Sequence, residues 1–322
     1  MSINQFFQKR INYQGDLKPF LQKVCNDFDL GEYQSFAIIP IGYEDFNLKL
    51  TTNKGNFFVK MFAASRNEEG CQRCVNIINH TLENGVSEPK LYRNGQEFLR
   101  KVGNDRLIVM EYVNGKTFFE LQAIPTTDEI KFIVKQAALI NKTNLKPSFI
   151  YDHWAITSFL KEYAEKGKYL LRADNELIRP LVDLFSSLDI KSLPHSLAKG
   201  DIIKTNIMKD SDGKIYIVDF AVANWYPRIQ ELAVLLCDLF FDPRHTEDFA
   251  KTYNFVLSEY QKYIKLTPEE IKLLPTFVKF AHAMHVLLAN YEKVVNGNSS
   301  AENEYFLNIG RVGLKFTIEL WR

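Results

Sequence analysis

Apolar residues in the first third of the chain follow first a helical and then a strand-like spacing. Leu17, Phe20, Leu21 and Val24 recur at steps of three and four, which predicts an amphipathic helix over 16–29. Strand-like runs bounded by turn-forming residues follow, and a second helical stretch separates the third run from the fourth. The predicted strands are 36–41, 46–51, 56–62, 89–92 and 106–112, and the second helix is 67–84. These runs predict a five-stranded sheet that begins as an antiparallel meander.

Beyond residue 112 the helical spacing dominates. The predicted helices are 128–143, 151–171 and 176–189, followed by helical pattern from 229 to the C-terminus with a polar break at 296–303. Residues 196–220 differ, because short apolar runs on either side of Asp212-Gly213 predict a hairpin within this helical half. The sequence therefore predicts an α+β fold of two domains, in which residues 1–112 hold the sheet and residues 113–322 are mostly helical.

Composition narrows the class of protein. Of 322 residues, 46% are hydrophobic and 25% are charged, which is ordinary for a folded globular protein. Lys+Arg number 40 and Asp+Glu number 39, so no excess charge favours binding to nucleic acid or to a lipid surface. No uncharged apolar run approaches the length of a membrane span, and the N-terminus lacks a basic-then-apolar signal pattern. We expect a cytoplasmic protein with no nucleic-acid or membrane partner.

Cysteine and histidine give weak signals for a metal site. The four cysteines, Cys25, Cys71, Cys74 and Cys237, are too few and too scattered for a disulfide framework, so we expect free thiols. Cys71 and Cys74 have the spacing of metal ligands, but no second pair completes a tetrahedral site. The remaining candidates, His282 and His285, share one helical face and fit core or surface histidines better than metal ligands.

Three side chains with the chemistry of phosphoryl transfer lie in and after the predicted hairpin. Asn206 follows Asp201 by five residues, and Asp219 follows the strand-like run 215–218. Phosphoryl transfer needs one carboxylate to orient the acceptor hydroxyl and accept its proton. It also needs an amide oxygen and a second carboxylate to hold Mg²⁺ on the phosphates. Asp201 fits the first role, and Asn206 with Asp219 fits the second.

The same residues carry a family resemblance. Lys199-Gly200-Asp201, Asn206 and Asp219-Phe220 resemble, in order and spacing, the His-Gly-Asp, Asn and Asp-Phe motifs of the aminoglycoside phosphotransferase and choline kinase superfamily. Residues 227–233 resemble its Asp-Pro-x-x-Asp-Leu-Ala segment, with Glu in place of the second Asp. The resemblance implies a bilobal protein-kinase-like fold, ATP or GTP as phosphoryl donor, Mg²⁺ as cofactor and a small-molecule hydroxyl as acceptor.

Lys60, in the N-terminal half, is a second feature that is typical of kinases. It lies in the third predicted strand, where kinase-like folds place the lysine that pairs with the α and β phosphates. A lysine among apolar strand residues otherwise needs a partner, unless it stands at a strand edge and faces solvent.

Four further residues complete the predicted nucleotide site. By resemblance, the turn at Gly42 would lie over the phosphates, and Asn47 matches the Asn that follows this loop in many relatives. Glu111 and Val113 follow the last predicted strand, where a hinge would offer backbone groups to adenine.

The sequence departs from the family at two places. Lys199 replaces the family histidine, and its ammonium can turn outward to solvent or inward toward the loop, Asp219 or the γ-phosphate. The helix after Lys60 should carry a glutamate, but Glu68 and Glu69 come early, and the usual positions hold Gln72, Arg73 and Asn76. These departures leave two alternatives open, a nucleotide-binding pseudokinase or scaffold and an atypical protein kinase. The latter lacks support because no Ala-Pro-Glu segment follows Asp219.

The acceptor site is predicted between the catalytic loop and the C-terminal helices. Candidates to line it are Trp225, Tyr226, Asp238, Phe240, Phe241 and Asp242. Acidic and aromatic groups together suit a cationic alcohol. The same residues stand at helical spacing, which equally predicts core packing.

Overall fold

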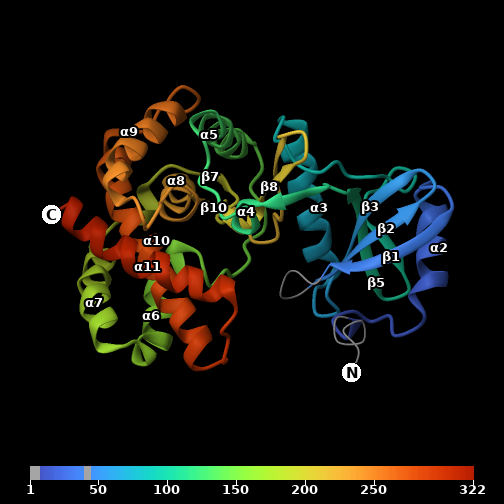
Figure 1. Cartoon of the computed structure of the whole chain (residues 1–322), viewed down its shortest axis with the longest axis horizontal. Coiled ribbons are helices and arrows are strands. Elements are labelled where there is room, and N and C mark those ends of the chain that lie inside the picture. Colours follow the sequence, from blue (N-terminus) through green and yellow to red (C-terminus); the bar gives the residue numbers. More distant parts are fainter. Residues whose placement is uncertain (1–7, 40–44) are drawn as a thin grey trace. The chain divides into compact units, whose positions relative to one another are not determined.

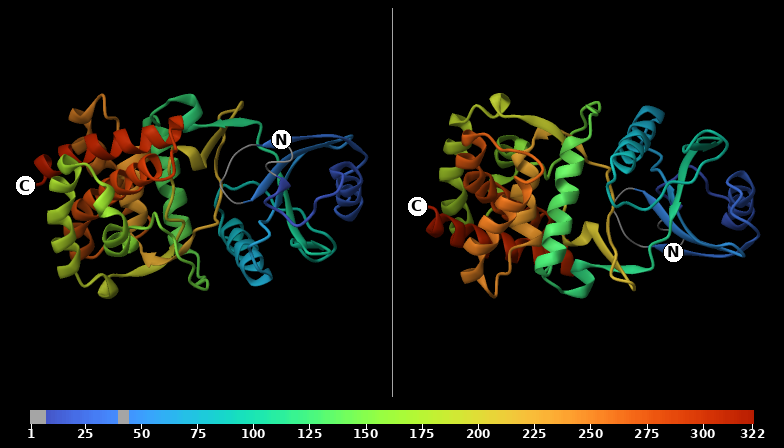
Figure 2. Two further views of the ribbon diagram at one scale, coloured as in Figure 1. Left: turned by 90° about the horizontal axis from the view of Figure 1, so that it is seen from below. Right: turned by 90° about the horizontal axis from the view of Figure 1, so that it is seen from above.

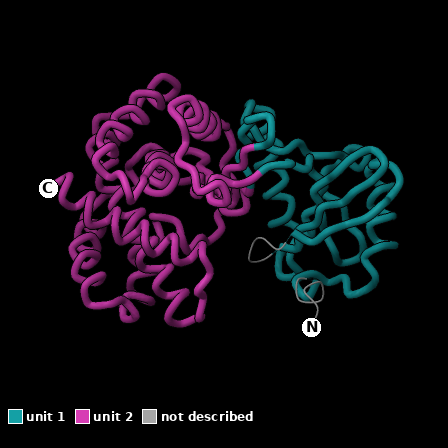
Figure 3. The backbone as a smooth tube through the Cα atoms, viewed as in Figure 1, with its two compact units in different colours: residues 1–115, 210–218 teal, residues 116–209, 219–322 magenta. Residues whose placement is uncertain are grey.

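The computed structural model describes residues 8–39 and 45–322 (Figure 1). The chain divides into two compact units, coloured separately in Figure 3. The first unit comprises residues 1–115 with 210–218, and the second comprises 116–209 with 219–322. The first unit thus extends three residues past the predicted boundary and gains a short segment from the middle of the chain.

An antiparallel five-stranded sheet forms the centre of the first unit. Its order is β1 (Tyr33–Ile39), β2 (Phe46–Thr52), β3 (Gly55–Met61), β5 (Asp105–Glu111) and β4 (Arg100–Val102). Two residues, Asn53 and Lys54, connect β2 to β3, whose register starts at the pair Thr52 and Gly55. One face of the sheet packs on α2 (Leu17–Asp27), in a core that includes Leu21, Val24, Leu48 and Val59.

The fifth strand lies elsewhere than the sequence predicts. The expectation of a strand over 89–92 is wrong, because only Leu91 forms an isolated bridge, with Met110. Pro89 lacks the N–H that a ladder requires. The strand is instead β4, which joins β5 through a tight turn. Gly103, with φ of +62°, supplies the left-handed conformation that this turn needs.

Helix α3 (Glu68–Glu83) begins where the Asn67 side chain accepts the Gly70 N–H at 2.8 Å. Cys71 and Cys74 lie on its buried face, with exposures of 0% and 2%. The spacing of three between these cysteines therefore serves packing of the helix. All four cysteines are free thiols, as expected.

The second unit is mostly helical. Its helices are α4 (Phe118–Leu121), α5 (Thr127–Lys142), α6 (Phe159–Lys166), α7 (Arg172–Ser187), α8 (Ile229–Val234), α9 (Phe249–Tyr260), α10 (Pro268–Val294) and α11 (Ala301–Leu320), with a π-helical turn η5 (Leu235–Leu239). The predicted helix 151–171 is shorter in the structure, because α6 is flanked by 3₁₀ turns at 156–158 and 167–169. The predicted helix 176–189 begins earlier, at Arg172. A break between α10 and α11 occurs as predicted, but α11 begins at Ala301, so the last three residues of the predicted break at 296–303 are helical.

Helix α10 forms the centre of this unit. Thr267 and Glu270 form a capping box at its start, and Pro268 occupies the first helical position. Among the described residues, α10 is the one helix long and apolar enough to cross a membrane, but 67% of its most apolar window is buried within the protein. It contacts α6, α7, α8 and α11 (Figures 1 and 2). Its apolar length therefore serves the core of the second unit.

The predicted hairpin at 196–220 is more elaborate than its pattern suggests. Strand β7 (His195–Ala198) pairs with β10 (Asn224–Pro227). Between them lie a 3₁₀ turn η4 (Lys204–Asn206) and the strands β8 (Ile207–Asp210) and β9 (Ile215–Ile217). Asp210 closes the β8–β9 connection, because its Oδ1 accepts the N–H groups of Asp212 and Lys214.

Candidate active site

A short loop between β7 and η4 presents Asp201. Gly200 precedes it with φ of +84°, a conformation that strains any residue with a Cβ atom. The sharp turn from Lys199 to Asp201 therefore depends on glycine at this position. Because β7 is paired with β10, the backbone that leads into the loop is held in place by strand hydrogen bonds.

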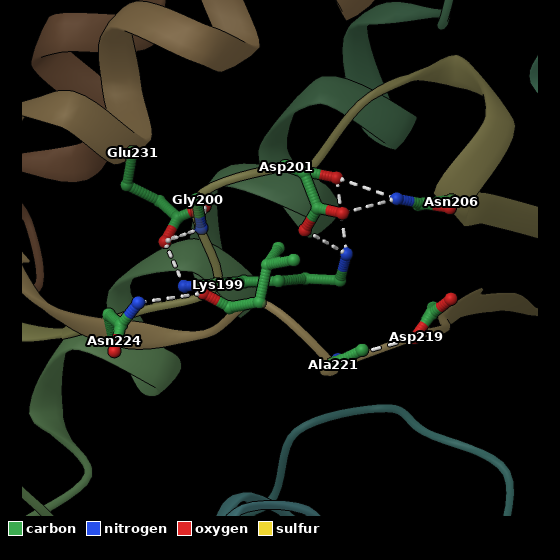
Figure 4. A network of polar contacts seen from close by, with 9 residues as sticks. Lys199, Gly200, Asp201, Asn206, Asp219, Ala221, Asn224 and Glu231 are labelled. Carbon is green, nitrogen blue, oxygen red and sulfur yellow. Dashed lines mark hydrogen bonds and ion pairs between the residues drawn. The ribbon is translucent and has the colours of Figure 1, made fainter. Parts of the chain in front are cut away.

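Asp201 uses both carboxylate oxygens within this loop (Figure 4). The Lys199 ammonium donates to Oδ1 at 2.6 Å, and the Asn206 amide donates to Oδ2 at 2.8 Å. Both donors also reach the Asp201 carbonyl oxygen, each at 3.1 Å. The carboxylate is held in one orientation by a cation and an amide, which is the preorganisation a proton acceptor needs.

Lys199 is fully buried, with 0% of its surface exposed. Its Nζ lies 5.6 Å from the centroid of the Phe220 ring. A buried ammonium needs an anion to offset the loss of hydration, and Asp201 supplies it. The alternative that Lys199 turns outward to solvent is therefore wrong.

The environment of Asp201 makes it a stronger base than an ordinary aspartate. Burial raises the pKa of its carboxyl to about 6, the Lys199 ammonium opposes that rise, and the charge of Asp219 adds to it. At pH 7 the carboxylate is mostly ionised and can accept a proton. Below pH 6 it is mostly protonated and cannot.

Asn206 and Asp219 present the hard oxygen ligands that Mg²⁺ prefers. Donation from Asn206 Nδ2 to Asp201 fixes the amide and leaves its Oδ1 on the opposite side. Asp219 is exposed and has φ of +61°, an uncommon conformation for a residue other than glycine. Its Oδ1 accepts the Ala221 N–H at 3.2 Å (Figure 4). An oriented amide oxygen and an exposed carboxylate near Asp201 fit a divalent cation.

The Glu231 side chain on α8 accepts hydrogen bonds from the backbone of this loop (Figure 4). Its Oε2 accepts the Lys199 N–H at 2.6 Å, and the Gly200 N–H donates to the same carboxyl at 3.3 Å. The side chain is fully buried, and burial raises its pKa to about 7. The glutamate that replaces the family aspartate thus orders the backbone on either side of the turn.

Asp152 is a further acidic group near Asp201 that no sequence motif indicates. It is 6% exposed, and its Oδ1 accepts the Trp154 N–H at 2.9 Å. Burial raises the pKa of its carboxyl to about 7, and repulsion from Asp201 adds to the rise. Asp152 lies about fifty positions before Asp201 in a loop without a recognisable pattern, so only the fold brings the two together.

Lys60 in the first unit is buried and paired. It is 8% exposed, and its Nζ lies 3.2 Å from Asp45 Oδ2. The alternative of a strand-edge lysine facing solvent is therefore wrong. Glu68 is exposed and pairs with Lys101. Neither Glu68 nor its exposed neighbour Glu69 forms the expected ion pair, and an aspartate just before β2 takes that place.

Asn47 stands directly opposite Lys60 in the β2–β3 register and is buried. Glu111 closes β5, and its N–H donates to the Lys90 carbonyl at 2.8 Å. The backbone N–H of Val113, two residues later, makes no backbone hydrogen bond within the described part of the chain. Gly42 lies outside the described residues. The nucleotide roles of these residues remain predictions.

Several residues predicted to line the acceptor site form core. Phe241 is fully buried and contacts the rings of Phe249 and Phe316. Tyr226 is 3% exposed, and its hydroxyl accepts from the Asn224 side chain at 2.9 Å. Core packing is therefore the better interpretation at these two positions, although Tyr226 lies in β10 and Phe241 follows η5.

His282 and His285 are buried side by side on α10. Cys237 Sγ lies 3.2 Å from Nδ1 of His282 and 3.4 Å from Nδ1 of His285. Burial lowers the pKa of the two imidazoles to about 3 and about 4, so both are neutral at pH 7. Within residues 8–39 and 45–322, no group of three histidine, cysteine or acidic side chains could hold a metal ion. These side chains pack the core.

Comparisons with known proteins identify the family and the fold. Residues 35–263 match the family model described as "Phosphotransferase enzyme family". A homoserine kinase from Parvibaculum lavamentivorans is 23% identical over 281 residues, which cover 86% of this chain and 86% of that protein.

Two solved structures share the fold. An amicoumacin kinase in complex with AMP-PNP, Ca²⁺ and Ami aligns with a TM-score of 0.65 and 14% identity, covering 99% of this chain and 96% of the other. A microcompartment-associated aminopropanol kinase aligns with a TM-score of 0.68 and 13% identity, covering 94% and 97%. At these identities the likeness shows the protein-kinase-like fold.

Proposed function

Because the chain belongs to the phosphotransferase enzyme family, we propose that it transfers the γ-phosphoryl group of ATP or GTP to a hydroxyl of a small molecule. The observation that carries the proposal is the Asp201 carboxylate, oriented by Lys199 and Asn206 beside the exposed Asp219. An oriented carboxylate next to two oxygen ligands is the arrangement that phosphoryl transfer uses.

In the proposed reaction, the acceptor oxygen forms a bond to the γ-phosphorus. The bond from that phosphorus to the β–γ bridging oxygen breaks, and the nucleoside diphosphate leaves. Asp201 orients the acceptor hydroxyl and takes its proton. Asn206 Oδ1 and the Asp219 carboxylate would hold Mg²⁺, which when bound offsets the negative charge of the phosphates.

Lys60 would contribute positive charge to the α and β phosphates. We expect Lys60→Ala to lower kcat/KM for ATP by about 100-fold, because charge stabilisation of the transferring group is lost. Steady-state kinetics with varied ATP would measure this. The matched control is Lys54→Ala, an exposed lysine of the β2–β3 turn that pairs with Asp29 and should stay within about twofold of wild type. An unchanged kcat/KM in Lys60→Ala would remove the lysine from the nucleotide site.

Lys199 should set the acidic limb of the pH–rate profile. The wild-type kcat/KM should fall as pH drops through about 6, where Asp201 becomes protonated. Lys199→Met removes the cation that favours the carboxylate, so the pKa of Asp201 should rise and the limb should move by at least about one unit to higher pH. Activity should then recover at alkaline pH, which a misfolded protein would not show.

Lys199→His restores the residue that the family carries. We expect it to stay within about tenfold of wild type, or ~1.4 kcal/mol in barrier, because that position braces the loop and does not take the proton. If the pH profile of Lys199→Met coincides with that of wild type, the ammonium does not tune Asp201.

The relatives suggest which acceptors to test first. Homoserine kinases match most of the chain, and an aminopropanol kinase shares its fold. We therefore propose a small alcohol that also carries an amine. Release of ADP with a panel of such alcohols, with ³¹P NMR to identify the phosphorylated product, would test the kinase. A protein that binds ATP and Mg²⁺ but forms no ADP with any alcohol would be a pseudokinase instead.

A further inference from the structure

One continuous helical stretch holds the catalytic loop at two points. It consists of α8 and the π-helical turn η5, which begins at Leu235, where α8 ends. On α8, the Glu231 carboxylate accepts the Lys199 N–H at the start of the loop. In η5, Asp238 Oδ1 accepts the Lys204 N–H at 2.7 Å, at the start of η4. Both carboxylates are fully buried. Two side chains of one element therefore fix the two ends of the loop.

The direction of the Asp238 side chain differs from its expected place in the acceptor site. The sequence makes it a candidate to line that site, but in the structure 0% of the residue is exposed and its carboxylate meets the loop backbone. Asp238 lies within the π turn, where the Phe240 N–H donates to the Leu235 carbonyl at 3.0 Å. Such turns are rare and frequent at functional sites. Here the departure from α-helical geometry coincides with the contact to the catalytic loop.

The contact with Asp238 fixes the short turn that carries Asn206. The turn η4 has three residues, with Lys204 first and Asn206 last. The first N–H of a helical turn has no acceptor within the turn, and Asp238 supplies one from outside. Asn206 closes the turn, because its own N–H donates to the Ile203 carbonyl at 2.9 Å. A shift of the Lys204 N–H would therefore move Asn206 as well.

The Lys204 ammonium compensates the buried charge of Asp238. Burial raises the pKa of the Asp238 carboxyl to about 6, and attraction to this ammonium opposes the rise. Asp238 and Asp242 both attract the ammonium, which is itself largely buried. A hydrogen bond to an ionised carboxylate is stronger than one to a neutral acceptor. The ammonium of Lys204 thus favours the charged form of the group that holds its own backbone.

We propose that Asp238 is a positioning residue, which keeps Asn206 in the orientation that binds Mg²⁺ and acts on it through the Lys204 backbone. This inference rests on the proposed function, in which Asn206 is a ligand of Mg²⁺. Asp238 itself would touch neither the metal nor the acceptor. The two buried carboxylates then divide the loop between them, because Glu231 orders the turn that presents Asp201 and Asp238 orders the turn that presents the metal ligand.

Calorimetric titration of ATP with and without Mg²⁺ tests this inference without turnover. The measured quantity is the factor by which Mg²⁺ tightens ATP binding. Asp238→Ala should lower this factor by about 10-fold and leave binding of ATP alone unchanged, because the turn that carries Asn206 loses its charged hydrogen bond. Asp238→Asn keeps an oxygen acceptor for the Lys204 N–H and should stay within about threefold of wild type. The control is Asp183→Ala, an exposed aspartate of α7, which should leave the factor unchanged.

A double-variant cycle separates positioning from a general structural role. Asn206→Ala removes the proposed ligand and should lower the factor without abolishing it, because Asp219 remains. Adding Asp238→Ala should then lower the factor no further. If the two losses multiply instead, Asp238 acts independently of Asn206 and the inference is overturned. An unchanged factor in Asp238→Ala would also overturn it. If Asp238→Ala does not fold, Asp238→Leu replaces the buried carboxylate by an apolar side chain, and the cycle is measured with that variant.

Failure of this inference is distinct from failure of the kinase. A non-additive cycle, with no ADP formed from any alcohol, would support the inference and overturn the kinase. Losses that multiply, in a protein that phosphorylates an alcohol, would overturn the inference alone. Equal ATP affinity with and without Mg²⁺ in wild type would overturn the metal role of Asn206 and the inference with it.

Discussion

Asp201→Asn should lower kcat by about 1,000-fold, because the amide cannot accept the proton of the acceptor hydroxyl. The ATP affinity should change little, since Asp201 is not assigned to the nucleotide. Single-turnover kinetics with saturating ATP and acceptor would measure the loss directly. Near-normal turnover in this variant would remove Asp201 from the chemistry.

The same change should also cost stability, because it leaves the buried Lys199 ammonium without its anion. We expect the free energy of unfolding to fall by about 2 kcal/mol. The double variant Asp201→Asn/Lys199→Met removes both charges, so it should recover most of the stability and none of the activity. Asp212→Asn, an exposed aspartate of the β8–β9 connection, is the matched control and should change neither.

Asp219→Ala should abolish the dependence of ATP binding on Mg²⁺, because it removes the carboxylate that would hold the metal against the phosphates. Calorimetric titration of ATP with and without Mg²⁺ reports this without any turnover. In wild type Mg²⁺ should tighten binding, and in the variant the two titrations should coincide. The loss of kcat should also approach that of Asp201→Asn.

Asp219→Asn keeps the local turn to Ala221 and an oxygen ligand but loses the negative charge, so it should fall between wild type and Asp219→Ala. A full Mg²⁺ effect in Asp219→Ala would mean that Asp219 only forms a turn.

The pKa of Asp201 offers a second check. Removing the repulsion from Asp219 should lower it, which moves the acidic limb of any residual activity to lower pH.

The predictable parts of the fold were those with long periodic patterns. The helix at 16–29, the helix at 128–143 and the three-stranded meander follow from spacing alone, because each buries one regular face. The edge strand β4 has three residues, too few for a pattern, and the sequence placed the fifth strand at 89–92 instead. Residues 210–218 belong to the first unit because of long-range contacts. No local spacing in the sequence encodes such contacts.

The sequence likewise predicts some residues of the candidate site and misses others. Asp201, Asn206 and Asp219 could be selected because they lie within nineteen residues of one another at a motif's spacing. Burial of Lys199 depends on Glu231 and Phe220, which close around it only in the folded chain. Asp152 comes from a distant segment with no motif, so sequence alone could not bring it near Asp201.

The ion pair between Lys60 and Asp45 has a consequence for regulation. In protein kinases the corresponding lysine pairs with a glutamate of a mobile helix, and displacing that helix switches the enzyme off. Here the Asp45 carboxylate is fixed instead by the backbone N–H of Ala63, just after β3, at 2.9 Å. The pair therefore contains no residue of helix α3. An inhibitor designed to push this helix aside, as for a protein kinase, should leave Lys60 in place and the enzyme active.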